Sequence, residues 1–535
     1  MLRLRINCTK ICYDSINNAK VFQINKNCLS STPQLLTVRA EVKQKTADVA
    51  WENAKPFSEI PKYEGISALL SFLPGGKYHG KNLLQLNREF QKEFGNIIFI
   101  KGMFGKPDTL LLYDPTDFEK VYRSEGVWPY RRDFEIFSHF RKNIRPDVYG
   151  INSGLLAEQG EKWKELRGQV NPVMMQPRVA KQYITPVEEV ADEFIEKLLK
   201  LRDTKNELPD DANNEFNKWA LESIGRIALD SRFGCLKDGV TKDSDTQKLI
   251  SAVDAFFELT YKLEILPSIW KIIKTPQYKE LINALETMTN ISLKKVDEAI
   301  ERLKNSQDSN QNKEASVLEK LLKIDRKVAV IMAMDMLLAG VDTTSHSTAI
   351  LMYFLATNQN AQDKLREEIM TILPEKSSRL ATDSFNHVPY LRACMKEATR
   401  LLPIAGGTIR KIPADIVLAG YQIPKGTEIA MNHFIPSQAE EQYDKPKEYI
   451  PERWLSNQEK KECPVTNHAH PFVHMPFGFG PRSCVGKRFA DLEIETFITK
   501  LLRNNKIEWN YGELQITSKL LTTPTSPLKF KITEL

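Results

Sequence analysis

A cysteine near the C-terminal end of the chain has neighbours of the types that stabilise a thiolate. Residues 477–486 read Phe-Gly-Phe-Gly-Pro-Arg-Ser-Cys-Val-Gly, and a helical pattern starts at Lys487. Glycines let backbone amides turn toward a thiolate, a helix N-terminus favours negative charge, and Arg482 adds a nearby cation. A lone cysteine is usually a small buried hydrophobic residue, but this spacing indicates a functional thiolate at Cys484.

Four shorter patterns also contain residues that do chemistry, although each is weak by itself. They are Trp163 with Arg167, the run Ala339-Gly-Val-Asp342-Thr343-Thr, Glu397 with Arg400, and Pro451-Glu-Arg453-Trp454. Glu/Arg pairs three residues apart are mostly solvent-facing salt bridges, and a Trp/Arg pair four apart is equally typical of a cation–π contact on a surface helix. A Thr beside an Asp is ordinary in a helix. The patterns therefore gain significance only from their order along the chain together with Cys484.

Taken together and in this order, the motifs resemble those of the cytochrome P450 superfamily, the haem-thiolate monooxygenases, and the resemblance covers the chain from Pro56 onward. It implies a P450 fold, which is mainly α with a smaller β-rich subregion and has a long central helix over the haem. It also implies haem b, iron protoporphyrin IX, as the cofactor, with Cys484 as the axial ligand of the iron. An anionic sulfur on one axial position favours O–O cleavage on the other.

On the long helix, the resemblance assigns catalysis to Asp342 and Thr343. A threonine in a helix bonds back to a carbonyl one turn earlier, and this would loosen the helix near Gly340. In the family this opens a groove for dioxygen, where the Thr343 hydroxyl donates a proton and Asp342 relays protons from solvent.

The resemblance also assigns residues to the haem propionates and to a buried charge network. A planar guanidinium suits a carboxylate better than an ammonium does, and the expected cofactor-binding residues are Trp163, Arg167, Arg410 and Arg482. The expected structural network, which would hold the cysteine segment without touching substrate, consists of Glu397, Arg400 and Arg453. In that network Trp454 should matter little.

The elements that must position these residues follow from hydrophobic periodicity. The longest helical signal runs over 325–357, roughly 50 Å at 1.5 Å per residue, and its first half is apolar nearly all round. This predicts a buried central helix, and Asp335 and Asp342 argue against a membrane span. The region before Leu402 is mostly helical, with strand patterns at 97–101 and 109–112. Beyond Leu402, β-like runs rich in Pro and Gly predict the β-rich subregion.

Composition and charge are those of an ordinary globular protein. Of 535 residues, 41% are hydrophobic and 27% charged, and most of the net charge of +6 comes from residues 1–40, which hold six basic residues and one acidic residue. A nucleic-acid binder would carry its excess of basic residues over a folded face, so an excess confined to the N-terminal segment excludes that class. Seven cysteines are too few in a chain of this length for a scaffold held together by disulfides. The acid-poor start without a long apolar run is typical of a mitochondrial transit peptide, with a disordered basic tail as the alternative. We predict a transit peptide at 1–40 and a single haem-thiolate monooxygenase domain at 41–535.

A presequence without a membrane anchor is typical of mitochondrial members of the superfamily, and the chain is similar to those of insects. The resemblance to these mitochondrial members implies that the protein lies on the matrix side of the inner membrane, in peripheral contact with it. It also implies that electrons come from NADPH through a ferredoxin reductase and an adrenodoxin-like [2Fe-2S] ferredoxin. The positions at which relatives dock ferredoxin match Arg392 and Lys396, and Lys487 and Arg488 extend this patch. Exposed basic residues on a helix are usually only solubilising, which is the alternative.

The predicted function is a monooxygenase that inserts one atom of O2 into a small apolar substrate, such as a steroid, a fatty acid or a xenobiotic. The alternatives are a non-catalytic haem-thiolate sensor or carrier, and an O2-independent haem isomerase that would need no proton relay. No motif identifies the substrate, because pocket walls in this family come from variable loops. A zinc site is a further alternative, although no standard zinc spacing is matched by Cys463, His468, His470 and His474.

Overall fold

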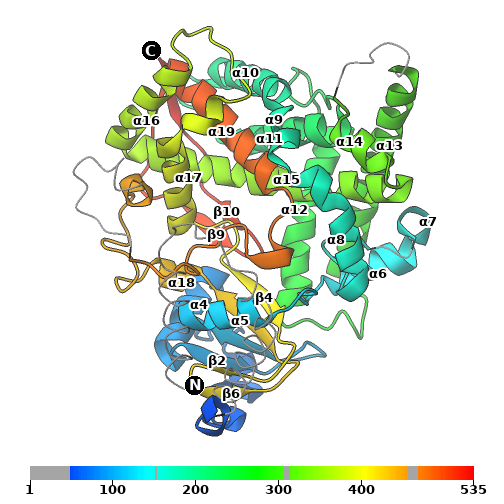
Figure 1. Ribbon diagram of the computed structural model, residues 1–535, viewed down its shortest axis with the longest axis vertical. Coiled ribbons are helices and arrows are strands. Elements are labelled where there is room, and N and C mark those ends of the chain that lie inside the picture. The colour runs from blue at the N-terminus through cyan, green and yellow to red at the C-terminus, as the bar shows by residue number, and fades with distance from the viewer. Residues whose placement is uncertain (1–48, 151–152, 307–313, 456–467) are drawn as a thin grey trace, which may run out of the picture.

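The structure is a computed structural model that describes residues 49–150, 153–306, 314–455 and 468–535. The predicted transit peptide at 1–40 and Cys463 lie outside these ranges. Within them the chain is mainly helical, and most strands gather at one end of the molecule, the bottom in Figure 1. The predicted fold class, mainly α with a smaller β-rich subregion, is confirmed.

Long helices form the larger part of the molecule and carry most of its buried apolar side chains. Local signals fix some of their ends; for example, the Ser244 side chain accepts a hydrogen bond from the Gln247 amide and begins α12. The helices of this part are α8 (Gly160–Met174), α9 (Pro177–Lys181), α10 (Ile184–Leu201), α11 (Ala212–Leu229), α12 (Asp245–Thr260), α13 (Pro276–Ser306), α14 (Val317–Leu322), α15 (Arg326–Thr357), α16 (Gln359–Ile372), α17 (Pro389–Leu401) and α19 (Lys487–Asn504).

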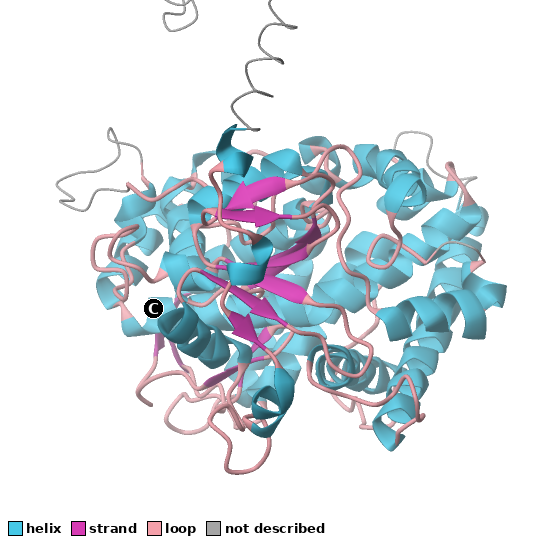
Figure 2. Cartoon of the chain, turned by 90° about the horizontal axis from the view of Figure 1, so that it is seen from below, coloured by secondary structure: helices cyan, strands magenta, loops and turns pink. Residues whose placement is uncertain are grey.

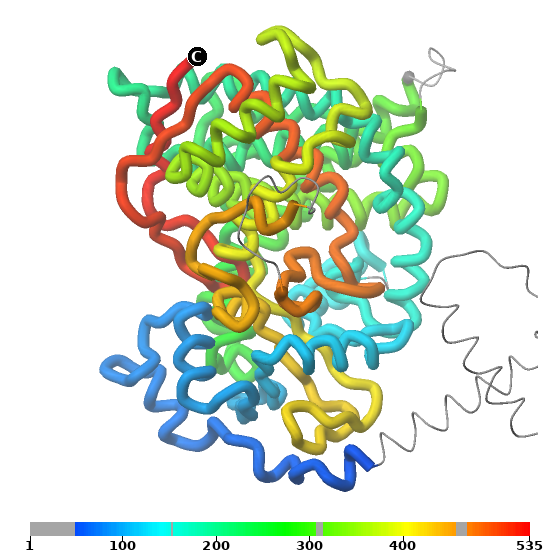
Figure 3. The backbone as a smooth tube through the Cα atoms, turned by 60° about the vertical axis from the view of Figure 1, so that its left-hand side comes forward, coloured from blue at the N-terminus to red at the C-terminus, as the bar shows by residue number. Residues whose placement is uncertain are grey.

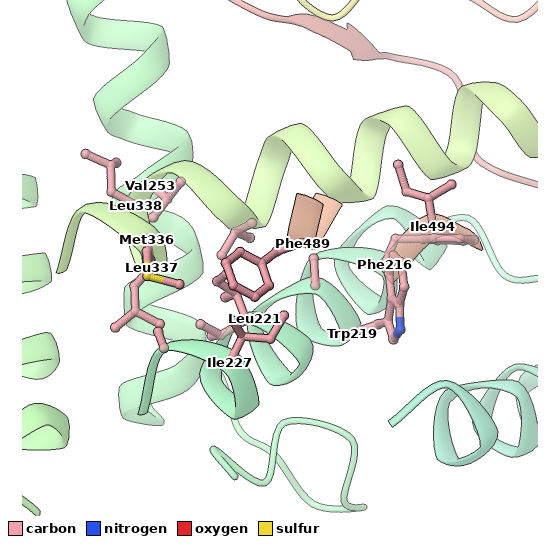
Figure 4. Close-up of a cluster of buried hydrophobic side chains, with 14 of the residues drawn as sticks. Phe216, Trp219, Leu221, Ile227, Val253, Met336, Leu337, Leu338, Phe489 and Ile494 are labelled. Carbon is pink, nitrogen blue, oxygen red and sulfur yellow. The ribbon is translucent and has the colours of Figure 1, made fainter. Parts of the chain in front are cut away.

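The central helix is α15, as the apolar pattern predicts. The Asp325 side chain accepts hydrogen bonds from the amides of Lys327 and Val328 and so begins the helix. α15 packs against α11, α13, α17 and α19, and Figure 4 shows Leu337 of α15 in the same apolar cluster as Leu221 of α11. Among the described residues α15 is the one helix long and apolar enough to cross a membrane, but 83% of its most apolar stretch is buried inside the protein.

A five-stranded sheet joins segments from distant parts of the chain. Its strand order is β1–β2–β3–β7–β4. β2 and β3 pair antiparallel, β3 pairs parallel with β7, and β4 pairs antiparallel with β7. In Figure 3 the blue N-terminal segment and the yellow segment with β4 to β7 run beside each other. The strands are β1 (Lys62–Tyr63), β2 (Ile97–Ile100), β3 (Thr109–Leu112), β4 (Gly407–Lys411) and β7 (Glu428–Asn432).

Three two-stranded sheets and several further helices complete the molecule. The sheets are β5 (Ile416–Leu418) with β6 (Tyr421–Ile423), β8 (Asn505–Glu508) with β11 (Lys531–Glu534), and β9 (Ile516–Ser518) with β10 (Thr522–Pro524). Figure 2 shows the strands with helices on both sides. The further helices are α3 (Gly65–Leu70), α4 (Leu83–Phe94), α5 (Pro115–Ser124), α6 (Glu135–His139), α7 (Pro146–Tyr149) and α18 (Phe434–Ser437).

Candidate active site

The cysteine segment forms a tight loop directly before α19. The Cys484 amide donates to the Phe477 carbonyl at 2.8 Å, and the Ser483 amide donates to the Gly480 carbonyl at 3.0 Å. Gly480 has a φ of +70°, and a Cβ there would lie 2.6 Å from Glu125 Oε1. Only glycine combines this left-handed backbone with so close an approach, so the residue type is dictated by the turn.

Two opposing effects act on the Cys484 thiol. Burial raises its pKa, whereas the backbone N–H groups of Gly486 and Lys487 and the guanidinium of Arg167 lower it. The expected amide contribution from the start of α19 is therefore present. The cation beside the sulfur is Arg167 of α8, not Arg482 as the spacing suggested. Adjacency in sequence does not place Arg482 at the sulfur, because the loop turns its side chain away.

Arg482 instead holds the cysteine loop against the segment before α8. Its guanidinium lies 3.8 Å from the centre of the Trp163 ring and donates to the carbonyls of Pro129 at 3.0 Å and Glu158 at 2.9 Å. Trp163 therefore pairs with Arg482 and not with Arg167, its neighbour four residues along α8. The two residues lie in the expected region, but their contacts are with the protein.

A buried cluster of four arginines lies around this loop. Burial and the charges of Arg131, Arg410 and Arg167 lower the pKa of Arg482 to about 9, and burial together with Arg410 lowers the pKa of Arg131 to about 10. Within the described residues, Arg410 is the one member of the cluster in an ion pair, with Glu125 at 2.5 Å. Arg131 has no motif around it, and sequence reasoning missed it.

This arginine cluster fits the two carboxylates of a haem. Arg167 Nε is buried and has no hydrogen-bond partner among the described residues, while its terminal nitrogen donates to the Ser483 carbonyl at 2.9 Å. Buried guanidinium groups without carboxylate partners are costly unless an anion joins them. A dianionic group beside this cluster would supply the charge that Arg131, Arg167 and Arg482 lack, next to Arg410 with its Glu125 partner. Because Arg167 of this cluster lies beside the Cys484 thiol, the arginines and the thiol fit the propionates and the iron of the same haem.

Asp342 and Thr343 lie on the central helix α15, as expected, and their role in catalysis stays a prediction. Thr343 Oγ1 donates to the Ala339 carbonyl at 2.6 Å, which is the predicted bond to the preceding turn. The helix nevertheless stays continuous through Gly340. Gly340 is needed for another reason, since a Cβ there would lie 2.8 Å from Ile224 of α11. Asp342 is buried and lines a cavity together with Asp254 of α12.

The expected charge network forms as a closed cluster. Arg400 Nε and Arg453 Nε each donate to the Glu397 carboxylate at 2.9 Å, and all three side chains are fully buried. Arg400 also donates to the carbonyls of Ser437 and Pro446. Trp454, expected from the sequence to matter little, also reaches this network, because its indole N–H donates to Glu397 at 2.8 Å. The network thus has a fourth member that the family pattern hides.

Comparison with known proteins decides the family. A family model described as Cytochrome P450 matches residues 63–532. The chain belongs to the cytochrome P450 family. It is 44% identical over 504 residues to "Cytochrome P450 CYP12A2" of Musca domestica, covering 91% of this chain and 93% of that protein.

Two further relatives are similar over nearly their whole lengths. The chain is 41% identical over 498 residues to "Probable cytochrome P450 12a5, mitochondrial" of Drosophila melanogaster, covering 91% of this chain and 93% of that protein. It is 39% identical over 483 residues to "Cytochrome P450 12b1, mitochondrial" of Drosophila acanthoptera, covering 89% and 90%. As a cytochrome P450 the chain binds haem and is a monooxygenase.

The predicted docking residues of this cytochrome P450 are exposed, and three of the four contact a neighbouring side chain. Arg392 donates to Glu495 at 2.7 Å, Lys396 lies 5.7 Å from the centre of the Trp454 ring, and Lys487 pairs with Asp491 at 2.6 Å. Arg488 is exposed at the start of α19. Lys487 and Arg488 are the first two residues of α19, and Val485 and Gly486 separate them from Cys484.

The zinc alternative finds no support in the part of the chain that the structure describes. His470 lies 3.3 Å from Glu119, and His474 hydrogen-bonds to Thr399 at 3.0 Å. No three His, Cys, Asp or Glu side chains are grouped to hold a metal ion among these residues.

Proposed function

We propose that this cytochrome P450 is a mitochondrial monooxygenase that receives electrons from a small [2Fe-2S] ferredoxin and inserts one atom of O2 into a small apolar substrate. The observation that carries the proposal is the joint placement of the Cys484 thiol, the amides that face it and the buried arginine cluster. We assign the axial iron ligand to Cys484 and the propionate contacts to Arg131, Arg167 and Arg410. Arg482 and Trp163 act on the cofactor by fixing the loop.

The residues of α15 provide for proton delivery. Haem, when bound, would activate dioxygen, one atom of which enters the substrate while the other is reduced to water. Asp342 takes up a proton at the cavity and passes it toward Thr343, the next residue on the helix. The bond from Thr343 Oγ1 to the Ala339 carbonyl orients the hydroxyl for this transfer.

Replacing the thiol tests the assignment of the ligand. The carbon monoxide adduct of the reduced protein should absorb near 450 nm through its thiolate ligand, and Cys484→Ala should lose this band. Cys394→Ala is the matched control, because Cys394 is a buried cysteine on α17 whose loss should leave the band in place. A retained band in Cys484→Ala would disprove the assignment.

Replacing Thr343 tests proton delivery. Thr343→Ala should still consume NADPH and O2 but release hydrogen peroxide in place of product, because the hydroxyl that passes the proton is gone. Ser347→Ala is the control, since Ser347 bonds back to the Thr343 carbonyl one turn later on the same helix. Normal coupling in Thr343→Ala would remove this residue from the mechanism.

The electron donor and the location rest on the basic residues of α17 and α19 and on the names of the mitochondrial relatives. Purified enzyme should turn over with NADPH, a ferredoxin reductase and a [2Fe-2S] ferredoxin, and poorly with a microsomal flavoprotein reductase. Wild-type protein that consumed no NADPH with either donor would favour the sensor, carrier or isomerase alternatives.

Peripheral contact with the inner membrane is supported by exposed apolar side chains. Ile66 is 77% and Leu70 55% exposed on α3, and Ile272 is 76% and Ile273 57% exposed between α12 and α13. Exposed apolar residues of this kind favour insertion at a membrane interface. Binding to cardiolipin-containing vesicles should fall when Ile272 and Ile273 are both replaced by Ser, and unchanged binding would disprove their role.

A further inference from the structure

A cavity of about 350 Å³ lies beside the central helix on the side of Asp342. α12, α15 and the turn between β9 and β10 enclose it. Its polar wall consists of Asp254, Glu258, Asp342, His346, Thr517 and Lys519. The volume is large enough for several water molecules, and polar walls favour their presence.

Within this cavity two carboxyl groups from different helices meet. Asp342 of α15 is only 2% exposed, and its Oδ1 receives no hydrogen bond from an N–H or hydroxyl group of the described residues. Asp254 of α12 lines the same cavity, and its carboxyl is near enough to raise the pKa of Asp342. Asp254 itself is exposed to the cavity. A hydrogen bond between two carboxyls requires that one of them carry a proton.

The charges around the pair do not neutralise it. Lys519, the cation of the cavity wall, pairs with Glu258, which also binds Lys262 at 2.9 Å. His346 is buried one turn after Asp342, and burial lowers its pKa to about 4, so it is uncharged at neutral pH. Its Nδ1 has no partner among the described residues. From α11, the neighbouring polar side chain is the uncharged Asn217, which bonds to Ser345.

Electrostatics therefore favours a single shared proton. Burial and the nearby Asp254 raise the pKa of Asp342 well above its usual range, and burial raises the pKa of Asp254 to about 6. Two carboxylates in contact cannot both ionise at low cost, so their protons come off in two separate steps.

We propose that Asp254 is a positioning residue for oxygen activation, and that it shares one proton with Asp342 to form a carboxyl pair between the cavity and Thr343. This inference rests on the proposed monooxygenase function. Water in the cavity donates a proton to Asp254 as Asp342 gives one up toward Thr343. The pair thus holds one proton and one negative charge both before and after each transfer. Neither a doubly protonated nor a doubly ionised pair has to form inside the protein.

The test compares Asp254→Asn with Asp254→Glu and Asp342→Asn in the haem-loaded protein. Asp245→Asn is the matched control, because Asp245 is an exposed acid on the same helix, paired with Lys294. Infrared spectra report the shared proton independently of turnover. Wild type should show a protonated-carboxyl stretching band at pH 7 that exchanges in D2O. Asp342→Asn should lose this band, and Asp254→Asn should shift its frequency, because burial alone still raises the pKa of Asp342 while the partner carboxyl is gone. Asp254→Glu and Asp245→Asn should retain the band.

Turnover provides the second readout. Asp254→Asn should keep the 450 nm band and substrate affinity, while product formation falls about tenfold, within the range of general acid catalysis, and peroxide release rises. In wild type, coupling should decline as pH rises and the shared proton is lost. In Asp254→Asn the like charge is gone, so the pKa of Asp342 falls and the decline should move to lower pH. Asp254→Glu should restore much of the wild-type profile.

Two results would overturn the proposal. One is an infrared band that keeps its wild-type frequency in Asp254→Asn, and the other is a pH profile of coupling that is the same in Asp254→Asn as in wild type. Failure of the monooxygenase function itself would appear differently, as wild-type protein that lacks the 450 nm band or consumes no NADPH, and the infrared result would still decide whether the pair exists.

Discussion

Two buried clusters of arginine in this protein differ in whether their charges are matched. In the network of α17, Glu397 faces Arg400 and Arg453, and backbone carbonyls take further guanidinium hydrogens. Around the cysteine loop, Arg410 alone of four arginines has a carboxylate partner within the described residues. In the matched cluster both arginines share a carboxylate, and Arg453 Nη1 lacks a hydrogen-bond partner among the described residues, whereas three arginines of the unmatched cluster have no carboxylate at all. Unmatched buried charge is therefore the sign that separates a ligand site from a structural network.

The largest expected effect comes from breaking the matched cluster. Glu397→Gln leaves two fully buried arginines without a negative partner, which should destabilise the protein by about 3–5 kcal/mol. The midpoint of urea unfolding measures this loss. Glu452→Gln is the control, since Glu452 pairs with the exposed Lys364, and it should cost about 1 kcal/mol. Equal losses in the two variants would show that burial does not set the strength of the network.

A substitution in the unmatched cluster should lower the affinity of the protein for haem and leave its free energy of unfolding nearly unchanged. Arg131→Gln removes one charged donor and should weaken haem binding by about 10- to 100-fold, with little change in urea unfolding of the haem-free protein. The rate of haem transfer to an acceptor protein measures the affinity.

A substitution of the neighbouring residue, Arg132, should affect stability and not haem binding. Arg132 is paired with Glu428, so Arg132→Gln should lower the urea midpoint and leave the rate of haem transfer unchanged. Parallel behaviour of the two variants would contradict the distinction between the clusters.

A smaller effect tests the fourth member of the matched cluster. Trp454→Phe keeps the aromatic packing but removes the indole N–H that reaches Glu397, and it should cost about 1–2 kcal/mol, as expected for a hydrogen bond to a charged group. Trp128→Phe, at an exposed position, is the control for stability. Wild-type stability in Trp454→Phe would restore the expectation drawn from the sequence that the residue matters little.

The smallest change in stability is expected where charge lies at the surface. Reversing Arg392 and Lys396 to Glu should alter unfolding by less than about 1 kcal/mol. It should nevertheless weaken ferredoxin-driven turnover steeply at low salt, with substrate binding unchanged, because steering depends on net charge. Reversal of Lys294 and Arg302, exposed on α13, is the control. Ferredoxin kinetics equal to wild type in the α17 variant would disprove docking there.

The sequence predicts those parts of the site that depend on local spacing. Local geometry within one or two turns is determined by the i,i+3 spacing of Glu397 and Arg400, by the glycines around Cys484 and by the apolar run of α15. The bond from Thr343 to Ala339 was predictable for the same reason.

Contacts between distant elements could not be predicted in this way. Arg131 enters the arginine cluster from a loop without a motif, and Asp254 meets Asp342 only because α12 packs against α15. The sequence also predicted Arg482 beside the Cys484 thiol, where the structure has Arg167. Adjacency along the chain does not tell which way a loop presents a side chain. Pairing of β3 with β7 depends on the whole fold. Such contacts arise from tertiary packing, which no periodicity within one element reveals.

The mixed sheet has a consequence for the order of events when the chain folds. Thr109 in β3 donates to Glu428 in β7 across 319 residues of sequence, so these two strands cannot pair before nearly the whole polypeptide is available. Contacts of such long range slow folding, since the entropy of the intervening loop must be lost first. In a chain that enters a compartment with its N-terminus first, β2 can pair with β3, but the other side of β3 stays unpaired until β7 arrives. During that interval β3 exposes a hydrogen-bonding edge, and a chaperone that binds extended segments would protect it from aggregation.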